Sequence, residues 1–507
     1  MRLNQIKVLD KNELQLIHES SLQLLEEVGI KIDDEKARKL LCEFGAIADN
    51  QSHFVRIPND MVKEQLKLVP DSFKLFGPDG SYSLEINTEN THYATLGAAV
   101  KLYDPSKKNQ IRKSTLKDNL DNLRLVDKLD NIHCSQIDLW PGDIKYTTIH
   151  VRCIYNWIKN SHKPYGHGCF GKLVSEDSIR MTSMIAGGDP EIIKHPRLFG
   201  IFNPTSPLHL PKIMTNGLEV FTKYKQPTII APEALAGTSA PISIAGLLTQ
   251  TNAEILSGVI LAQLYNPGAP VFYGSVSHTT DMRTGNSAIG AIETSLITSG
   301  IAQLAKFYQI PSRAIGAVTD SKLLDMQNGF ERFQTLLFAA SAGINFITCA
   351  TTYEATLAGA LELTVIDNEL IGMVKRAIDG INISNDTIGL DVIKKVATNI
   401  DQGATFLGEK HTRLHMKKEL FIPEFCDRNR RASWQKLGAK DLLKKAKEKI
   451  DALLKDFQEY KVEASLEKEL QNYIELVNKR TYEDYVKIED IGKSNITLPN
   501  GKNSSHL

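Results

Sequence analysis

The sequence predicts a (β/α)8 barrel with an N-terminal α+β cap and a C-terminal helical extension. Between about residue 91 and residue 353, one unit recurs eight times: a short apolar, β-leaning run followed by a stretch with helical periodicity. Strand–helix units in series form a parallel sheet, and eight of them close into a barrel. The predicted strands are His92–Leu96, Ile132–Ile137, Pro164–Cys169, Leu198–Phe202, Thr228–Ala231, Pro270–Gly274, Arg313–Val318 and Ile344–Cys349.

Residues 1–90 are predicted to form the cap. Two segments have apolar residues at helical spacing and stop at a glycine, the residue best suited to follow a helix. Two shorter β-leaning runs are each followed by turn-forming residues. The predicted elements are the helices Asn12–Val28 and Asp34–Phe44 and the strands Phe54–Ile57 and Phe73–Phe76.

The barrel is predicted to span residues 91–385, with a helix after each strand. Each predicted helix has apolar residues three and four positions apart, and several begin with a Ser, Thr or Asp cap and end near Gly or Pro. They are Thr115–Leu129, Thr147–Lys159, Ser175–Ile185, Lys212–Lys225, Ala253–Leu264, Ala288–Phe307, Phe330–Ala342 and Glu362–Ile378.

Residues 386–507 are predicted to be a helical extension. Its helices are Thr387–Ile400, the lysine- and glutamate-rich Lys440–Tyr460, and Leu466–Val477. The polar stretch Gly492–Leu507 is predicted to be frayed. These helices could form an interface between subunits, so the sequence favours a homo-oligomer.

Composition indicates a globular protein without nucleic-acid or membrane partners. Apolar residues make up 42% and charged residues 24%, while 60 basic and 60 acidic residues cancel. A nucleic-acid or anionic-membrane partner usually requires a basic excess. The N-terminus has no apolar signal core, no run is long enough to span a bilayer, and the six cysteines form no C-x-x-C pair. A reducing cytoplasmic location is expected.

In a (β/α)8 barrel the chemistry lies on the loops after the strands. The residues there that could contact a substrate are Tyr93, Trp140, Tyr165, His167, Asn203, Glu233, Tyr273, Asp281, Arg283, Asp320, Lys322, Gln327, Tyr353 and Glu354. Taken singly, each polar one is about as often a helix cap, and each aromatic one is more often a packing residue. Their convergence on one rim indicates a site.

Two histidines, His411 and His415, share one face of a predicted helix, a spacing that zinc sites use. No glutamate lies between them, so the pair is not the metalloprotease motif, and a structural or interface role is favoured. One alternative function is nevertheless a metal-dependent barrel hydrolase that uses both histidines with His167 and Asp320.

A series of motifs resembles the trimethylamine methyltransferase family in order and over nearly the whole chain. The motifs are Gly237–Gly246 (GTSAPISIAG), Asn252–Glu254, Gln263–Pro270 (QLYNPGAP), Thr319–Glu331 (TDSKLLDMQNGFE), Gly343–Asn345, His411–His415 (HTRLH), and Trp434 with Gly438. The resemblance implies a barrel enzyme that moves a methyl group from a methylated amine to the cobalt of a corrinoid protein.

Family members that use trimethylamine carry pyrrolysine, which this chain lacks. The resemblance places its counterpart near Asp320–Gln327, with Lys322 as the candidate, and favours the pyrrolysine-free branch that demethylates quaternary amines. The expected substrates are glycine betaine, proline betaine or carnitine. The expected methyl acceptor is the Co(I) of a corrinoid carried by a cognate partner protein, with no cofactor or metal bound in this chain.

A quaternary ammonium group has no N–H, so aromatic faces and carboxylates must hold it. The predicted cage is Tyr93, Trp140, Tyr165, Tyr273 and Tyr353, with Glu233, Asp281 or Glu354 as the anionic partner. The predicted donors to a betaine carboxylate are Arg283, Lys322, His167 and Asn203. Asp320, Lys322 and Glu233 are the predicted catalytic residues, and Gln327 completes the set. A non-catalytic betaine-binding protein, or a scaffold for a corrinoid protein, is the remaining alternative.

Overall fold

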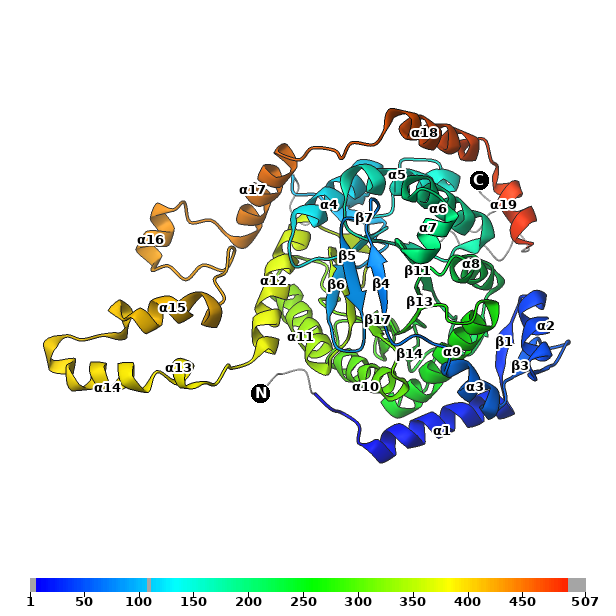
Figure 1. Cartoon of the computed structure of the whole chain (residues 1–507), viewed down its shortest axis with the longest axis horizontal. Coiled ribbons are helices and arrows are strands. Elements are labelled where there is room, and N and C mark those ends of the chain that lie inside the picture. The colour runs from blue at the N-terminus through cyan, green and yellow to red at the C-terminus, as the bar shows by residue number, and fades with distance from the viewer. Residues whose placement is uncertain (1–5, 107–110, 491–507) are drawn as a thin grey trace.

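A computed structural model of the chain describes residues 6–106 and 111–490, and its centre is an eight-stranded parallel sheet. The strands follow one another round the sheet, and a bridge between Ala94 and Cys134 joins the first to the second, which closes the barrel (Figure 1). The predicted fold class is confirmed. The strands are β6 (His92–Thr95), β9 (Ser135–Gln136), β10 (Tyr165–Gly168), β11 (Leu198–Phe202), β13 (Thr228–Ile230), β15 (Val271–Gly274), β18 (Ser312–Ile315) and β19 (Phe346–Ala350).

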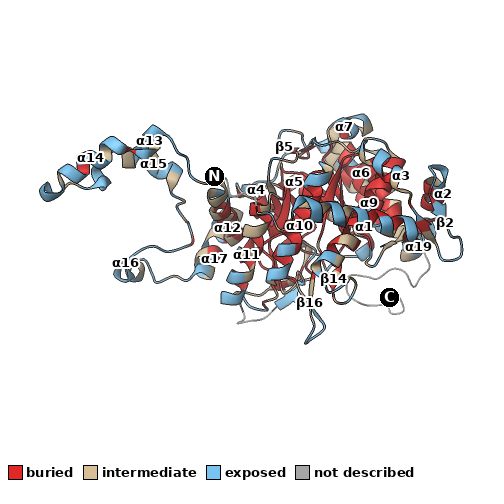
Figure 2. Cartoon of the chain, turned by 90° about the horizontal axis from the view of Figure 1, so that it is seen from below, coloured by how far each residue is buried: buried red, intermediate tan, exposed pale blue. Residues whose placement is uncertain are grey.

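Eight helices surround the barrel, one after each strand. Figure 2 shows their buried faces turned toward the strands and their exposed faces turned outward. They are α4 (Leu116–Lys128), α5 (Ile149–Asn160), α6 (Gly171–Ala186), α8 (Lys212–Lys223), α9 (Ile244–Tyr265), α10 (Ile292–Tyr308), α11 (Met326–Ala342) and α12 (Leu361–Asp379). By length and composition α9 is apolar enough to cross a membrane, but 78% of its most apolar window is buried inside the protein, as in a core helix.

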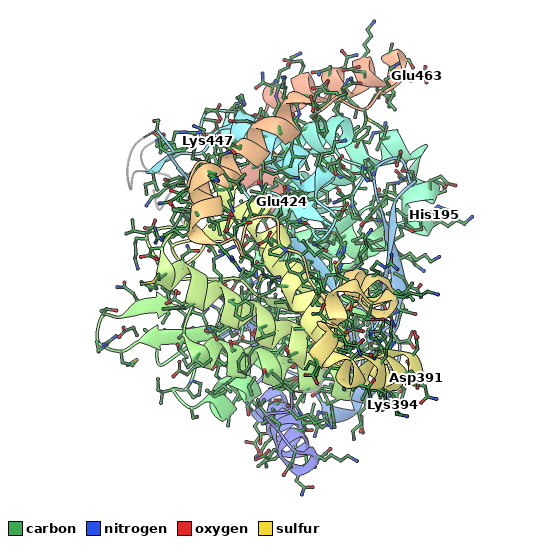
Figure 3. The ribbon with its side chains drawn as sticks, turned by 90° about the vertical axis from the view of Figure 1, so that its left-hand side faces the viewer. His195, Asp391, Lys394, Glu424, Lys447 and Glu463 are labelled. Carbon is green, nitrogen blue, oxygen red and sulfur yellow. The ribbon has the colours of Figure 1, made fainter. Side chains whose placement is uncertain are left out.

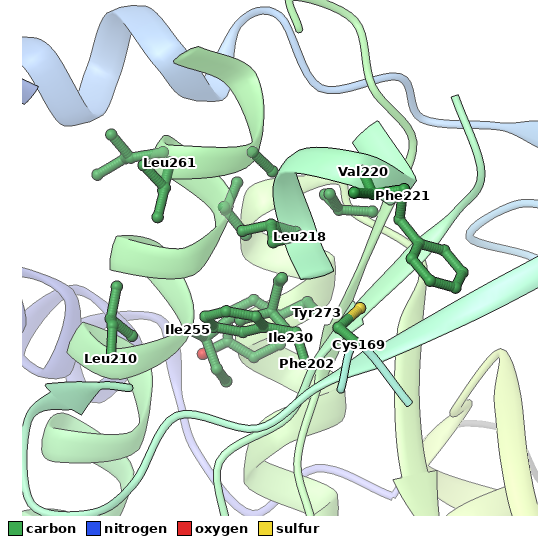
Figure 4. Close-up of a cluster of buried hydrophobic side chains, with 14 of the residues drawn as sticks. Cys169, Phe202, Leu210, Leu218, Val220, Phe221, Ile230, Ile255, Leu261 and Tyr273 are labelled. Carbon is green, nitrogen blue, oxygen red and sulfur yellow. The ribbon is translucent and has the colours of Figure 1, made fainter. Parts of the chain in front are cut away.

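Alternation along each strand decides which side chains enter the barrel. Phe199, Ile229 and Phe272 belong to the cluster inside it, whereas the next residues, such as Ile230 and Tyr273, pack outward against the helices. Figure 4 shows Tyr273 in that outer layer, among apolar residues of β11, β13 and α9.

The N-terminal segment packs beside the barrel rather than over its mouth. Its strands pair with one another and with β12 (His209–Leu210), and helices α1 and α3 lie against α9. The Asp10 side chain caps α1, and Glu13 completes a capping box. The elements are α1 (Lys11–Glu27), β1 (Ile30–Ile32), α2 (Glu35–Glu43), β2 (Ile47–Ala48), β3 (Phe54–Arg56) and α3 (Asn59–Leu66).

A hairpin, β4 (Phe73–Phe76) and β5 (Ser83–Ile86), fills the N-terminal end of the barrel (Figure 1). The Phe73 ring lies edge-on to Phe272 at 5.1 Å, and Phe272 contacts Phe346 at 5.2 Å. Arg197, just before β11, donates to the Gly77 and Pro78 carbonyls at 2.7 Å each and so fixes the turn. Because this end is filled, the C-terminal end is where a ligand can enter.

Two small sheets decorate the C-terminal end. One joins β7 (Lys101–Tyr103), β8 (Ile111–Lys113), β20 (Thr352–Tyr353) and β21 (Ala358–Gly359), and the other joins β14 (Leu235–Ala236), β16 (His278–Asp281) and β17 (Asn286–Ala288). The short helix η1 (Tyr146–Thr148) also lies at this end, before α5, whereas the short helix α7 (Asp189–Lys194) connects α6 to β11 at the opposite end.

The chain beyond α12 first leaves the barrel and then wraps round it. Helices α13 (Asn385–Ile388), α14 (Leu390–Thr398), α15 (Lys410–Glu419) and α16 (Arg431–Lys436), with η2 (Ile400–Gln402) and η3 (Phe406–Gly408), project from the body (Figure 1). Then α17 (Leu442–Lys455) packs on α12 and α4, α18 (Ala464–Asn478) on α5 and α6, and α19 (Tyr482–Glu489) on α6 and α8. The predicted helix Thr387–Ile400 is broken at Gly389, whose φ is 62°. The predicted frayed stretch Gly492–Leu507 lies outside the described residues.

If the phenylalanine cluster seals the barrel, truncating its central member will be costly. We expect Phe272→Ala to lower the free energy of unfolding by about 3–5 kcal/mol, because a large buried ring is replaced by a cavity. Phe330→Ala is the matched control, since Phe330 is 70% exposed and its loss should change stability by less than about 0.5 kcal/mol. Urea unfolding measures both, and equal losses would show that the cluster does not hold the barrel end.

Candidate functional site

A cavity of about 520 Å³ opens at the C-terminal end of the barrel. The loops after β9, β10, β11 and β13 supply one side of it, and helix α19 supplies another. The lining residues are Trp140, Tyr146, Thr147, His150, Phe170, Val174, Asn203, Pro204, Thr205, Ser206, Pro211, Ile213, Met214, Glu233, Tyr482, Tyr485 and Glu489. Its size is that of a small-molecule site.

Five aromatic side chains line this cavity. The Trp140 ring lies 6.0 Å from Tyr146 and 6.4 Å, edge-on, from Phe170. Tyr482 and Tyr485 come from α19, more than 300 residues further along the chain. We name Trp140, Tyr146, Phe170, Tyr482 and Tyr485 the aromatic cage. Rings of this kind present the negative face that attracts a cation.

One carboxylate of the cavity makes no hydrogen bond with a described residue. Glu233 follows β13 and is exposed in the mouth. The other carboxylate, Glu489, is committed to structure: it accepts hydrogen bonds from the Lys172 and Leu173 N–H groups at 2.7 and 2.9 Å and so caps α6. Of the two carboxylates that line the cavity, Glu233 is therefore the one not engaged in hydrogen bonds within the described structure.

A buried ion-pair network anchors α19 beside the cavity. Asp177 of α6 accepts from both terminal nitrogens of Arg480, at 2.6 and 3.0 Å, from the Tyr473 hydroxyl at 2.7 Å and from His150 Nε2 at 2.8 Å. Burial acts to raise the pKa of Asp177, but the hydrogen bonds from His150 and Arg480 outweigh it and hold the pKa below its usual range. The carboxylate is thus ionised, and His150 donates to it.

His167 lies behind the cage, with its ring 6.2 Å from Phe170 and 6.3 Å from His150. Burial and the neighbouring His150 lower its pKa to about 3, so the ring is neutral. Nδ1 faces the Gly168 carbonyl at 2.8 Å and must donate, which leaves Nε2 as a buried acceptor without a partner among the described residues. Neutral His167 in this tautomer therefore has no N–H left to donate to a substrate carboxylate, which is the role predicted for it.

Arg313 lies inside the barrel and is not among the site residues predicted from the sequence. Arg313 of β18 is buried and donates to the Ser275 carbonyl and to Thr348 Oγ1, at 3.3 and 2.6 Å. Its Nε has no partner in the described structure. Burial lowers the pKa of Arg313 to about 10, while the charge of Glu233 opposes the shift.

Four of the five predicted cage aromatics lie elsewhere. Tyr93 packs against His133 and the helices, Tyr165 stacks on Trp157 at 5.6 Å, and Tyr353 packs among apolar residues of the β20–β21 hairpin region. Tyr273 donates to Asn252 Oδ1 at 2.8 Å and stacks on Tyr308. On their strands Tyr93, Tyr165 and Tyr273 face the helix layer because side chains alternate, so only Trp140 of the predicted set lines the cavity.

The remaining predicted residues divide between the cavity and the rest of the rim. Asn203 and Glu233 line the cavity, although the Asn203 amide nitrogen already donates to the Ala231 carbonyl at 2.6 Å. Asp281 and Arg283 do not line it: they pair with each other at 2.7 Å on the β16–β17 hairpin, where the Arg283 side chain is 88% exposed. An arginine so exposed and already paired is not placed to bind a carboxylate in the cavity.

The loops after β18 and β19 hold the other predicted residues. Asp320 accepts from the Ile289 and Gly290 N–H groups at 3.1 and 2.9 Å, and burial raises its pKa. Lys322 is exposed and donates to the Asp320 carbonyl, while Gln327 donates to Glu331. Glu354 has a φ of 53° and contacts Ser321 through its backbone. None of these four lines the cavity described above.

His411 and His415 lie on α15, in the segment that projects from the body, with ring centres 4.3 Å apart. Their neighbour is Asp386, whose carbonyl lies 3.0 Å from His411 Nε2 and whose carboxylate lies 3.3 Å from His415 Nε2. Residues 6–106 and 111–490 contain no group of three or more His, Cys, Asp and Glu side chains arranged to hold a metal ion. The structure does not bring these histidines to His167 and Asp320.

Sequence reasoning missed Tyr482, Tyr485 and Asp177. A local cue for α19 exists, because Thr481 and Asp484 form a capping box at its start. Nothing local shows that this helix returns to the barrel mouth; that follows from the buried Arg480–Asp177 pair, which joins residues 303 apart.

The fold and the cavity define a (β/α)8-barrel protein with an aromatic-lined cavity at the C-terminal end of the barrel. The chain belongs to the trimethylamine methyltransferase family, whose model, "Trimethylamine methyltransferase (MTTB)", matches residues 1–483.

Two relatives by sequence agree with this membership. The chain is 35% identical to the glycine betaine methyltransferase of Desulfitobacterium hafniense (strain Y51) over 384 residues, which cover 75% of this chain and 79% of that one. It is 32% identical to the trimethylamine methyltransferase MttB of Methanosarcina barkeri (strain Fusaro / DSM 804) over 457 residues, covering 89% and 90%. Among solved structures, the monomethylamine methyltransferase MtmB of Methanosarcina barkeri aligns over 89% of both chains, with 10% identity and a TM-score of 0.49.

Removing the Arg480 side chain from the buried network is expected to detach α19 from the barrel. We expect Arg480→Ala to destabilise the fold by about 3 kcal/mol, because the Asp177 carboxylate is left buried without its charge partner. The variant should also be cut faster by trypsin at Lys487, which lies on α19. Arg283→Ala removes an exposed pair and is the matched control, for which we expect no change.

The same network predicts a pH dependence. The pKa of Asp177 is lower in the folded protein than in the unfolded chain, where it is about 3.9. Its stabilisation is therefore complete above that pH and is lost as the pH falls through the lower folded-state value. Unfolding curves between pH 2 and 6 would show this loss for the wild type but not for Asp177→Asn, and identical pH profiles would contradict the assignment.

Proposed function

We propose that this protein transfers a methyl group from a quaternary amine of the betaine type to the Co(I) of a corrinoid carried by a separate partner protein. The observation that carries the proposal is the aromatic cage together with the carboxylate of Glu233 in the same cavity, which makes no hydrogen bond with a described residue. Membership of the family and the similarity to a glycine betaine methyltransferase support it. Glycine betaine, proline betaine and carnitine are the substrates we propose.

The cage suits a quaternary ammonium group. Such a group carries a positive charge and no N–H, so hydrogen bonds cannot hold it, whereas aromatic faces and a carboxylate can. Thr147 Oγ1 and the Tyr482 hydroxyl also belong to lining residues and are buried without a partner in the described structure. These two hydroxyls are the groups we assign to the carboxylate of a betaine, in place of Arg283 and Lys322.

The proposed reaction needs positioning more than acid–base catalysis. The electron pair of Co(I) forms the new carbon–cobalt bond, and the carbon–nitrogen bond breaks with its pair going to nitrogen, so the leaving group is a neutral tertiary amine. No proton is transferred in this step. The task of the cage is to hold the ammonium group so that one methyl faces the open mouth, where the acceptor arrives. Glu233 contributes attraction for the cation rather than a proton.

Two rival functions remain testable. A metal-dependent hydrolase would require His167 and Asp320 to share an ion with His411 and His415, and these lie on the barrel and on the projecting segment respectively. A non-catalytic betaine-binding protein would use the same cage without transferring the methyl group.

A reducing cytoplasmic location, supported by six free cysteines, is part of the proposal.

Truncating the cage should weaken substrate binding without unfolding the protein. We expect Trp140→Ala to raise the Kd for glycine betaine about 30-fold, corresponding to the loss of about 2 kcal/mol from one desolvated ring. Trp434→Ala is the matched control, because Trp434 lies on α16 outside the cavity and should leave the Kd unchanged. Calorimetric titration measures both, and an unchanged Kd for Trp140→Ala would remove this residue from the site.

The reaction itself is tested with free Co(I) cobalamin, a panel of quaternary amines and trimethylamine. We expect the absorbance of methyl-cobalt to appear with a betaine and not with trimethylamine. Binding of a betaine with no methylation of cobalamin or of any supplied corrinoid protein would favour the binding protein. Methylation by trimethylamine alone would contradict the quaternary-amine proposal.

A further inference from the structure

Helix α9 contains a buried carboxylate, Glu254, that the proposed chemistry does not use. Charged side chains normally lie at the surface, as Asp391 and Lys447 do in Figure 3, whereas Glu254 is 0% exposed. Burial raises the pKa of Glu254, and the groups that oppose this shift are a hydroxyl, a backbone N–H and an amide, all of them neutral. A carboxylate placed in a core helix among neutral donors costs stability, so its contacts need an explanation.

Two of the hydrogen bonds to Glu254 hold the loop that follows β11. Ser206 Oγ donates to Glu254 at 2.7 Å, and the Leu208 N–H donates to it at 2.8 Å. Leu208 has a φ of 50°, a left-handed conformation that a leucine keeps only when its surroundings hold it there. Ser206 lines the cavity together with its neighbours Pro204 and Thr205. Glu254 therefore fixes this wall of the cavity without being one of its lining residues.

A third hydrogen bond joins that wall to the loop after β13. Gln250, one turn earlier on α9, donates through Nε2 to Glu254 at 2.9 Å and to the Ser239 carbonyl at 2.9 Å. The Ser239 hydroxyl in turn accepts from the Leu235 N–H at 2.9 Å, two residues beyond Glu233. One pair of side chains on α9 thus holds both the loop after β11 and the loop that carries Glu233.

The two polar residues of the Asn252–Glu254 motif have different tasks. Asn252 Oδ1 accepts from the Tyr273 hydroxyl at 2.8 Å, and its Nδ2 donates to the Tyr308 hydroxyl at 2.9 Å, both in the layer between the barrel and its helices. Glu254 instead contacts loops at the mouth. The Asn252 contacts account for packing, and the Glu254 contacts bear on the cavity.

We propose that Glu254 is a positioning residue for the substrate: it sets the distance between the Ser206 wall and the Glu233 loop, and so determines how large a quaternary amine the cavity admits. This inference rests on the proposed function, because the substrate that is positioned is the one proposed there. A displaced wall changes the space for a bulky amine more than for a small one. A wall that is already ordered also spares the ligand the cost of ordering it.

Two substitutions of Glu254 separate shape from hydrogen bonding. Glu254→Gln keeps the shape and can satisfy all three donors: its amide oxygen accepts from Leu208 and Gln250, and its amide nitrogen donates to Ser206 Oγ, since a hydroxyl also accepts. Glu254→Leu removes both acceptor atoms. Gln250→Ala, which cuts only the link between the two loops, keeps the test available if Glu254→Leu does not fold.

Gln263→Leu is the matched control. Gln263 is equally buried, lies at the other end of the same helix, and bonds the Ala269 carbonyl and the Gly268 N–H at 2.8 and 2.9 Å. Its loss should lower stability without moving a wall of the cavity.

Calorimetric titration with glycine betaine and with carnitine gives the ratio of their two dissociation constants. Glu254→Leu should change that ratio at least about tenfold, and Gln250→Ala should change it in the same direction. Glu254→Gln and Gln263→Leu should keep the wild-type ratio. A loss of stability alone lowers the folded fraction for both ligands equally and leaves the ratio unchanged.

Hydrogen exchange of residues 203–211 measures the same wall without a ligand. Glu254→Leu should speed this exchange at least about tenfold, while Glu254→Gln and Gln263→Leu should not. Unchanged exchange in Glu254→Leu, or faster exchange with an unchanged ratio, would overturn the proposal. If the wild type binds neither amine while the exchange responds as expected, the quaternary-amine function is contradicted and the hold of Glu254 on the cavity wall is confirmed, so the two failures are distinguished.

Discussion

The structure depends on the apolar contact between the β4–β5 hairpin and the inside of the barrel. Phe73, Phe272 and Phe346 meet there with their rings 5.1 to 5.2 Å apart, and the hairpin occupies the end at which the strands begin. A barrel filled from one side has a single open end. That constraint leaves the loops after the strands as the end at which a ligand can enter, and elements from distant parts of the chain line the cavity there.

The fold was predictable because its signals are local and repeated. Eight apolar runs, each followed by a helical pattern, specify a parallel barrel even where a strand shortens, as β9 does to Ser135–Gln136. The candidate site was harder to predict. Trp140, Asn203 and Glu233 line the cavity, whereas Tyr165 and Tyr273 are on the far side of their strands, since a shift of one residue along a strand reverses the facing of the side chain. Tyr482 and Tyr485 depend on a tertiary contact that no local pattern encodes.

Membership of the trimethylamine methyltransferase family and the chemistry of the cavity are two separate lines of evidence, and they agree. The family match ends at residue 483, so Tyr485 and Glu489 lie beyond the matched segment although both line the cavity. The aromatic cage thus combines barrel loops inside the segment that the family model matches with helix α19, which lies at the end of that segment. Differences in that helix would change the shape of the cavity while the barrel stayed the same.

The position of α19 has a consequence for the order in which the protein matures during synthesis. The last barrel helix ends at Asp379, and Glu489 follows about 110 residues later, which at roughly 5–20 residues per second is about 5–20 s of translation. Throughout that interval a nascent barrel carries the phenylalanine-sealed end but lacks one wall of its cavity. Completion of the cavity is therefore coupled to translation of the C-terminal helices.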